Sequence, residues 1–252
     1  MGAFAERVTR RFSIDQSEIA WLERLEANPV RVKRGHLIAQ EGDPAECAYV
    51  LMTGWVMSCS RFADGSHQTR RLHFSGDLLA MPSIPMRHYA EDLEALSDAV
   101  IAPFPKRMLA KLFNMPRLAG IMYMFAQAER ISAGDRIASL GHDSAKARIA
   151  FLLMDILHRL RSADHTVTNS FFLHLTREQI AHVTGITPVH ASRMWSALNA
   201  DGLICCARRT VTIVDEERLA NLGHYSDRDG DFDYRWLLAV EDQTSAGLRG
   251  LR

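Results

Sequence analysis

Residues 175–204, LTREQIAHVTGITPVHASRMWSALNADGLI, constrain the fold of this chain more than any other segment. Thr176 is followed three residues later by a glutamine, the capping box that starts many helices. Gly185 supplies the positive φ that a tight turn needs. Thr187 with Pro188 then marks a second helix start, because a capping hydroxyl precedes a residue that lacks a backbone N–H. Two short helices joined by a glycine turn predict a helix-turn-helix.

The following residues, DGLICCARRTVTIVD, predict a wing. A short strand, a turn at 207–209 and a β-branched second strand make a hairpin. A helix-turn-helix with a wing is typical of proteins that place the second helix in the major groove of DNA. The alternative is a helical hairpin that serves protein contact. The side chains expected to contact phosphates or bases around this motif are His174, Thr176, Arg177, Arg193, Arg208 and Arg209.

Charge is distributed unevenly, although the net charge of the 252 residues is zero. Residues 144–214 carry eight Lys or Arg and four Asp or Glu, whereas residues 215–252 carry five and nine. The excess over the predicted helix-turn-helix is consistent with a polyanionic partner. The chain contains no run of 18 apolar residues, so we predict no membrane span. Residues 1–12 lack the apolar core of a secretory signal. We therefore expect a cytoplasmic protein.

The first half of the chain has the pattern of a β domain. Glycines recur at Gly35, Gly42, Gly54, Gly65 and Gly76, with short apolar runs between them. Turn signals at this spacing are typical of β-sandwiches and barrels. The dipeptide before Ser66, Asp-Gly, predicts a hairpin turn.

A helical period replaces this pattern over residues 116–142. Apolar positions at alternating steps of three and four predict a seam of about three heptads. One interpretation is a core helix of its own domain. The other, which the length favours, is a helix that pairs with its twin in a dimer. The predicted dimer seam consists of Ile121, Met124, Ala128, Ile131, Asp135 and Ala138.

Three motifs together resemble the Crp/Fnr family of bacterial transcription regulators. They are RGHLIAQEGDPAECAYVLMTGWV, FSGDLLAM and the helix-turn-helix segment, and the resemblance covers residues 12–222. It implies an α+β chain: a β-roll (double-stranded jelly-roll) over 1–115, a dimerisation helix over 116–142 and a winged helix-turn-helix over 143–222. An acidic extension over 223–252 follows.

The resemblance also implies function. It predicts a regulator without catalytic activity or cofactor, a homodimer that binds palindromic double-stranded DNA and contacts RNA polymerase. The recognition-helix residues that match the family are Thr187, Pro188, Val189, His190, Ser192 and Arg193. Val189 stands where the best-known members have a glutamate that reads a C·G pair, so we expect a different half-site.

The effector is left open. The region GDLLAMPSIPMRHYAEDLEAL lacks the G-E-L and Arg-Ser-Ala motifs of cyclic-nucleotide binders, with Arg87 its only basic residue among several acidic ones. Cyclic AMP is therefore not expected. An iron–sulfur cluster is not expected either, because no cysteine precedes Cys47. Haem remains an alternative, with His36, His67, His73 and His88 as possible ligands, and a cupin-like metalloenzyme is a more distant one.

Two further segments carry hypotheses. Cys205 and Cys206 lie next to each other in the predicted wing, so their side chains should face opposite ways. Nearby arginines would favour the thiolate of the exposed one and make it a redox candidate. The tail DRDGDFDYRWLLAVED does not fit an EF-hand loop, and we expect Tyr234, Trp236 and Leu237 to pack back on the body.

Overall fold

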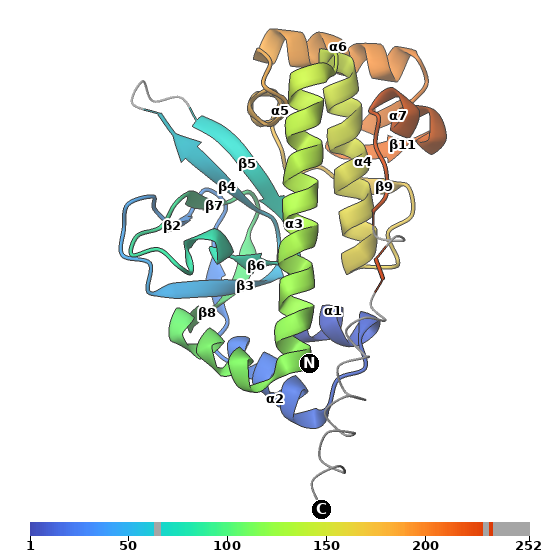
Figure 1. Ribbon diagram of the computed structural model, residues 1–252. Coiled ribbons are helices and arrows are strands. Elements are labelled where there is room, and N and C mark those ends of the chain that lie inside the picture. Colours follow the sequence, from blue (N-terminus) through green and yellow to red (C-terminus); the bar gives the residue numbers. More distant parts are fainter. Residues whose placement is uncertain (63–66, 229–231, 234–252) are drawn as a thin grey trace, which may run out of the picture.

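The computed structural model describes residues 1–62, 67–228, 232 and 233 (Figure 1). The helices are α1 (Ala3–Arg11), α2 (Gln16–Leu25), α3 (Pro116–His142), α4 (Ala145–Ala163), α5 (Arg177–Thr184), α6 (Pro188–Ala200) and α7 (Glu216–Leu222), with 3-10 turns η1 (Met81–Ser83) and η2 (Lys106–Asn114). The strands are β1 (Val30–Val32), β2 (Leu37–Ala39), β3 (Cys47–Thr53), β4 (Val56–Arg61), β5 (His67–His73), β6 (Leu78–Leu79), β7 (Asp92–Ala95), β8 (Ala99–Pro105), β9 (Ser170–Phe172), β10 (Ile204–Ala207) and β11 (Thr210–Ile213).

The N-terminal part is an antiparallel β domain, as the glycine spacing predicts. Its two four-stranded sheets have the orders β1-β8-β3-β6 and β2-β7-β4-β5. Gly54 shows why the glycines recur, because it has φ of 93° and an added Cβ would lie 2.6 Å from the Asp98 carbonyl oxygen. The predicted Asp-Gly hairpin turn lies outside the described residues.

Helix α3 runs alongside the β domain, with α4 beside it (Figure 1). Ile121 and Met124 are buried in a cluster with Phe4, Trp21 and other apolar residues of the first two helices. Those two residues of the predicted dimer seam therefore belong to the core of their own chain. Asp135 is also engaged within the chain, through ion pairs of 2.8 and 3.0 Å with Arg228.

A different face of α3 is exposed. Tyr123 and Ile137 have 58% and 71% of their surface accessible, and Ala126, Arg130 and Ala133 between them are also exposed. These five positions are spaced by three and four residues, which is the spacing of a coiled-coil seam. Ile131 and Ala138 of the predicted seam are exposed as well, so the predicted seam stays a prediction for that half of the helix.

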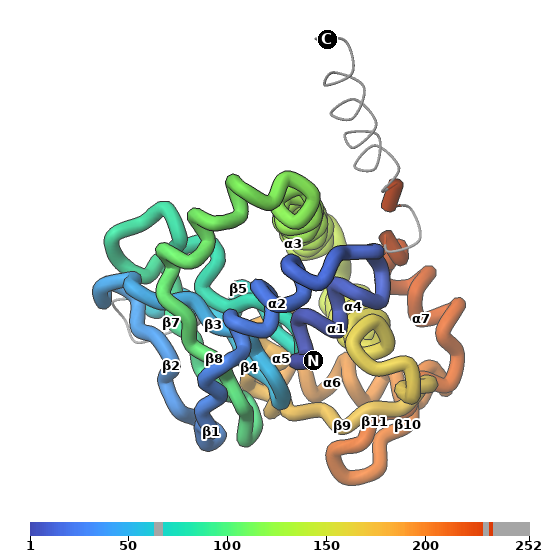
Figure 2. Tube along the Cα trace, turned by 90° about the horizontal axis from the view of Figure 1, so that it is seen from below, coloured from blue at the N-terminus to red at the C-terminus, as the bar shows by residue number. Residues whose placement is uncertain are grey.

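The C-terminal part combines α4–α7 with a small sheet of order β10-β11-β9. Its apolar core is continuous with that of the β domain, since Trp55 and Phe74 pack in the same cluster as Leu153 and Leu173. In the view of Figure 2 the β sheets of the N-terminal part lie to one side of α3 and α4 and α7 to the other, while α5 lies next to β5. Across the boundary, Arg159 on α4 donates to the Asp77 carboxylate at 2.7 Å.

Over the described ranges, none of the helices combines the length and apolar character needed to cross a membrane. The tail residues Tyr234, Trp236 and Leu237, which we expected to pack on the body, lie outside those ranges.

Candidate nucleic-acid interface

The helix-turn-helix forms as its capping residues predict. The Thr176 hydroxyl accepts from the Gln179 N–H at 3.1 Å, and the Gln179 side chain accepts from the Thr176 N–H at 2.9 Å. Gly185 has φ of 64° in the turn, and the Thr187 hydroxyl accepts from the His190 N–H at 3.3 Å. Thr184 is buried, and its hydroxyl donates to the Ile180 carbonyl oxygen at 2.7 Å.

Helix α6 has a buried and an exposed face. Ala191, Trp195 and Leu198 are buried against the rest of the domain. The six residues expected to read DNA are all exposed: Thr187, Pro188, Val189, His190, Ser192 and Arg193. Ser196 and Asn199 extend the same exposed face, and the sequence analysis missed them although helical periodicity could have found them. The helix therefore offers a polar surface with one permanent cation, Arg193.

The two arginines of the wing have different surroundings. Arg208 is exposed in the turn, with φ of 57°. Arg209 turns back, because its Nε donates to the Leu173 carbonyl oxygen at 3.2 Å and its guanidinium lies 5.7 Å from the Phe172 ring centroid. Its side chain supports β9, so the phosphate contact expected of Arg209 is not favoured.

Two other predicted phosphate contacts have structural roles. The His174 ring lies between Trp55 and Phe172, at centroid distances of 5.2 and 4.8 Å. Burial, then the charges of Arg209 and Arg34, lower the pKa of His174, so the phosphate contact predicted for this ring is not favoured. Arg177 stacks on Trp195 at 3.7 Å and joins the first helix to the second.

Comparison with known proteins agrees with this geometry. A cyclic nucleotide-binding domain matches residues 29–115, and a Crp-like helix-turn-helix domain matches residues 147–222. The chain belongs to the Crp/Fnr family of transcription regulators. Over 215 residues it is 24% identical to the fumarate and nitrate reduction regulatory protein of Escherichia coli (strain K12), covering 84% of this chain and 86% of that protein.

Solved structures show the same fold. FixK2 from Bradyrhizobium japonicum superposes with a TM-score of 0.71 at 25% identity, covering 79% of this chain and 98% of FixK2. A CRP-family transcriptional regulator from Thermus thermophilus gives 0.63 at 23% identity, covering 78% and 97%. The family consists of transcription regulators and not of enzymes, which agrees with the absence of catalysis expected from the sequence.

In this Crp/Fnr regulator a cavity of about 520 Å³ lies between the β domain and α3. Its lining is more basic than the sequence analysis expected, because five arginines contribute to it against three acidic residues: Arg7, Arg70, Arg71, Arg130 and Arg136 against Asp77, Glu91 and Glu129. The arginines come from α1, β5 and α3 and lie outside residues 76–96, where the sequence motifs of cyclic-nucleotide binders would stand. Arg87 does not line it.

Two buried polar atoms of the cavity wall lack a hydrogen-bond partner among the described residues: Arg71 Nε and His73 Nδ1. Burial, then the charge of Arg71, lowers the pKa of His73, so the ring is neutral at pH 7. An unpaired buried polar atom costs about 1–3 kcal/mol, and a ligand that bonds both atoms would recover that cost. Of the other haem candidates, His36 and His88 are exposed on separate loops.

The two wing cysteines face opposite ways, as expected. Cys205 is exposed, whereas Cys206 is half-buried and accepts from Trp195 Nε1 at 3.2 Å. Burial raises the pKa of the Cys206 thiol, with Trp195 and Arg177 opposing it. The redox role predicted for the pair therefore stays a prediction for Cys205 alone.

Proposed function

We propose that this Crp/Fnr regulator acts as a homodimer that binds a palindromic DNA site, with α6 of each copy in a major groove. The exposed face of α6, with Arg193 at its centre and the Arg208 turn beside it, is the observation that supports DNA reading. The cytoplasm as its location and RNA polymerase as a further partner are proposals from family membership.

The dimer would form along the exposed seam of α3, defined by Tyr123, Ala126, Arg130, Ala133 and Ile137. Alanines at two of the five positions allow two helices to approach closely, and the flanking Tyr123 and Ile137 supply the apolar area. Two copies related by a two-fold axis bind two half-sites related in the same way.

The test is selection of bound sequences from a random DNA pool with the full-length protein. We expect enrichment of one inverted repeat, with half-sites about one helical turn apart. Enrichment of an unpaired half-site would contradict the dimer, and no enrichment above a protein-free control would contradict sequence-specific DNA binding.

We further propose that the cavity between the β domain and α3 binds a small anionic effector. Four arginines of β5 and α3 in its wall and two unpartnered buried polar atoms among the described residues support this proposal. Ala126, Arg130 and Ala133 belong both to the cavity wall and to the exposed seam, so a ligand there would affect how two α3 helices pack.

The effector proposal can be tested with cyclic AMP, inorganic phosphate and citrate as probes. At least one should raise the Tm of the protein, and Arg70→Gln should remove the rise while Arg24→Gln on α2 should not. Equal responses of both variants would contradict binding in this cavity, as would no response of the wild type to any probe.

A further inference from the structure

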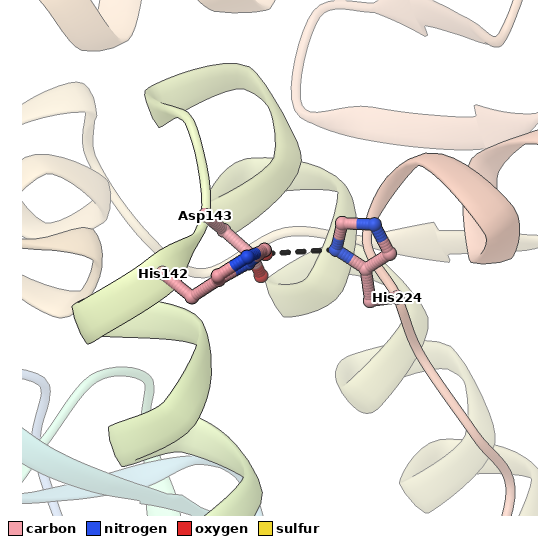
Figure 3. Close-up of side chains that lie close together, drawn as sticks. All are labelled: His142, Asp143 and His224. Atoms are coloured by element: carbon pink, nitrogen blue, oxygen red, sulfur yellow. Dashed lines mark hydrogen bonds and ion pairs between the residues drawn. The ribbon is translucent and has the colours of Figure 1, made fainter.

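Three side chains with metal-binding atoms converge where α3 meets α4 (Figure 3). His142 is the last residue of α3, Asp143 caps it, and His224 follows α7. The Asp143 Oδ1 atom lies 2.8 Å from His224 Nδ1 and 3.3 Å from His142 Nδ1. One ligand atom of each residue lies within 4.8 Å of the other two.

Asp143 is buried and held in place. Its side chain is 4% exposed, and its second oxygen accepts from the Ser139 hydroxyl at 2.7 Å. One of its oxygens is thus oriented by Ser139 and the other is directed at the two histidines, as the oxygens of metal ligands commonly are.

His224 is held in place by backbone packing. It has φ of 48°, a conformation that few residues other than glycine adopt. The preceding Gly223 lies so close to α4 that an added Cβ would be 2.5 Å from the Phe151 nitrogen. The next residue, Tyr225, donates its N–H to the Ala220 carbonyl oxygen at 2.9 Å. The ring of His224 thus reaches the end of α3 from a segment anchored on α4.

The surroundings permit entry of an ion. Both histidines are exposed, and a cavity of about 200 Å³ borders all three residues. The cation nearest in that wall, Arg228, is paired with Asp135. Every cation among the described residues of this wall therefore already has a carboxylate partner, so none of them repels a metal ion with an unbalanced charge.

We propose that His142, Asp143 and His224 form a binding site for a divalent transition-metal ion, with Zn²⁺ as the best fit. Two imidazoles and a carboxylate are ordinary zinc ligands at about 2.0–2.2 Å. Ligand atoms of a tetrahedral site at those bond lengths lie about 3.3 Å apart. The observed separations therefore need only small side-chain rotations, and a fourth position stays open for water.

The site joins three parts of the chain: the end of α3, the start of α4 and the segment after α7. A bound ion would replace the hydrogen bonds between the two histidines and Asp143 by three coordinate bonds, one to each residue. These bonds would lie at the junction between the seam helix and the DNA-reading domain. Metal occupancy would thereby fix the angle between them. This inference does not depend on the identity of the DNA site or of the effector.

The test is Zn²⁺ titration of the untagged full-length protein against a chromophoric chelator. The variants are His142→Ala, His224→Ala and Asp143→Asn, and His165→Ala is the control, because it removes an exposed histidine from the loop between α4 and β9. Unfolding of each metal-free variant, followed by circular dichroism, shows that it is folded. With Co²⁺ as a second probe, visible absorption reports tetrahedral coordination.

We expect one equivalent of Zn²⁺ to bind the wild type and the control. Loss of an outer-shell partner already weakens metal sites by about 10–100-fold, so each ligand variant should lose at least that much. Equal affinity of the control and the three folded variants would overturn the proposal. A wild type that takes up no zinc, or Co²⁺ spectra of octahedral intensity, would overturn it as well.

Discussion

Arg193 is the single residue on which DNA affinity should depend most. It is exposed on α6, on the side opposite Trp195 and Leu198. Arg193→Ala should weaken binding to the selected site by about 1–3 kcal/mol, because it removes the cation that we propose bonds guanine or a phosphate. Fluorescence anisotropy with labelled duplexes measures this change.

Arg24→Ala is the matched control, since it removes the same charge on α2, at the end of the molecule far from α6 (Figure 1). Both variants should unfold at the wild-type temperature. Equal losses of affinity in the two variants would mean that Arg193 contributes only to the general charge of the protein.

Gly223 is a second position where a single-residue substitution should have a large effect, in this case on the stability of the fold. Gly223→Ala should destabilise the fold by about 2 kcal/mol, because the new Cβ meets the α4 backbone, which cannot move aside as a side chain would. Asn221→Ala, on an exposed neighbour in α7, should stay within about 0.5 kcal/mol of the wild type. Urea denaturation gives both values, and a stability of Gly223→Ala close to that of its control would contradict the close packing.

In helix α3, sequence periodicity alone does not determine which side of the helix packs on its own domain. Two stripes of this helix satisfy the three-four spacing: one through Ile121 and Met124, the other through Tyr123 and Ile137. The side of the helix that faces its own domain is decided by packing against α1 and α2, which are distant in the sequence. The helix-turn-helix was predictable because capping boxes, turn glycines and N1 prolines act within a few residues.

Substitutions in the two stripes of α3 should have different effects, one on dimerisation and the other on stability. Ile137→Asp should convert the proposed dimer to a monomer without unfolding it, since the side chain is 71% exposed in one copy. Met124→Asp should destabilise the chain itself by placing a charge in the core. Sedimentation velocity reports mass and urea denaturation reports stability. An Ile137→Asp protein that stays dimeric would contradict the proposed seam.

At the scale of the whole molecule, Asp77 joins the β domain to its neighbours. Its carboxylate pairs with Arg7 of α1, Arg71 of β5 and Arg159 of α4. Burial alone would raise the pKa of Asp77, but Arg159, Arg7 and Arg71 together lower it far below the usual range. The sequence could not predict this cluster, because its members are spread from the first helix to α4 and no local pattern links them.

Asp77 also predicts a pH dependence. Because its pKa is lower in the folded state, its stabilisation is complete above the unfolded pKa of about 3.9 and is lost as the pH falls below that value. Asp77→Asn should cost about 3–5 kcal/mol at pH 7, since it leaves three arginines without their shared carboxylate. The cost should be smaller by about 1 kcal/mol at pH 3. Urea denaturation at both pH values tests this, and a cost that does not fall at pH 3 would contradict the shift.

If α6 reads base pairs, a substitution at Val189 should change the DNA sequence that the protein selects. This side chain is 64% exposed at the start of the helix, and valine cannot accept a hydrogen bond from a base. Glutamate at this position can accept from the cytosine N4 amino group. The measurement is the random-pool selection, repeated with Val189→Glu beside the wild type. We predict that the enriched half-site changes to C·G at one position and is kept elsewhere. An identical motif for both proteins would contradict it, because Val189 would then lie away from the bases.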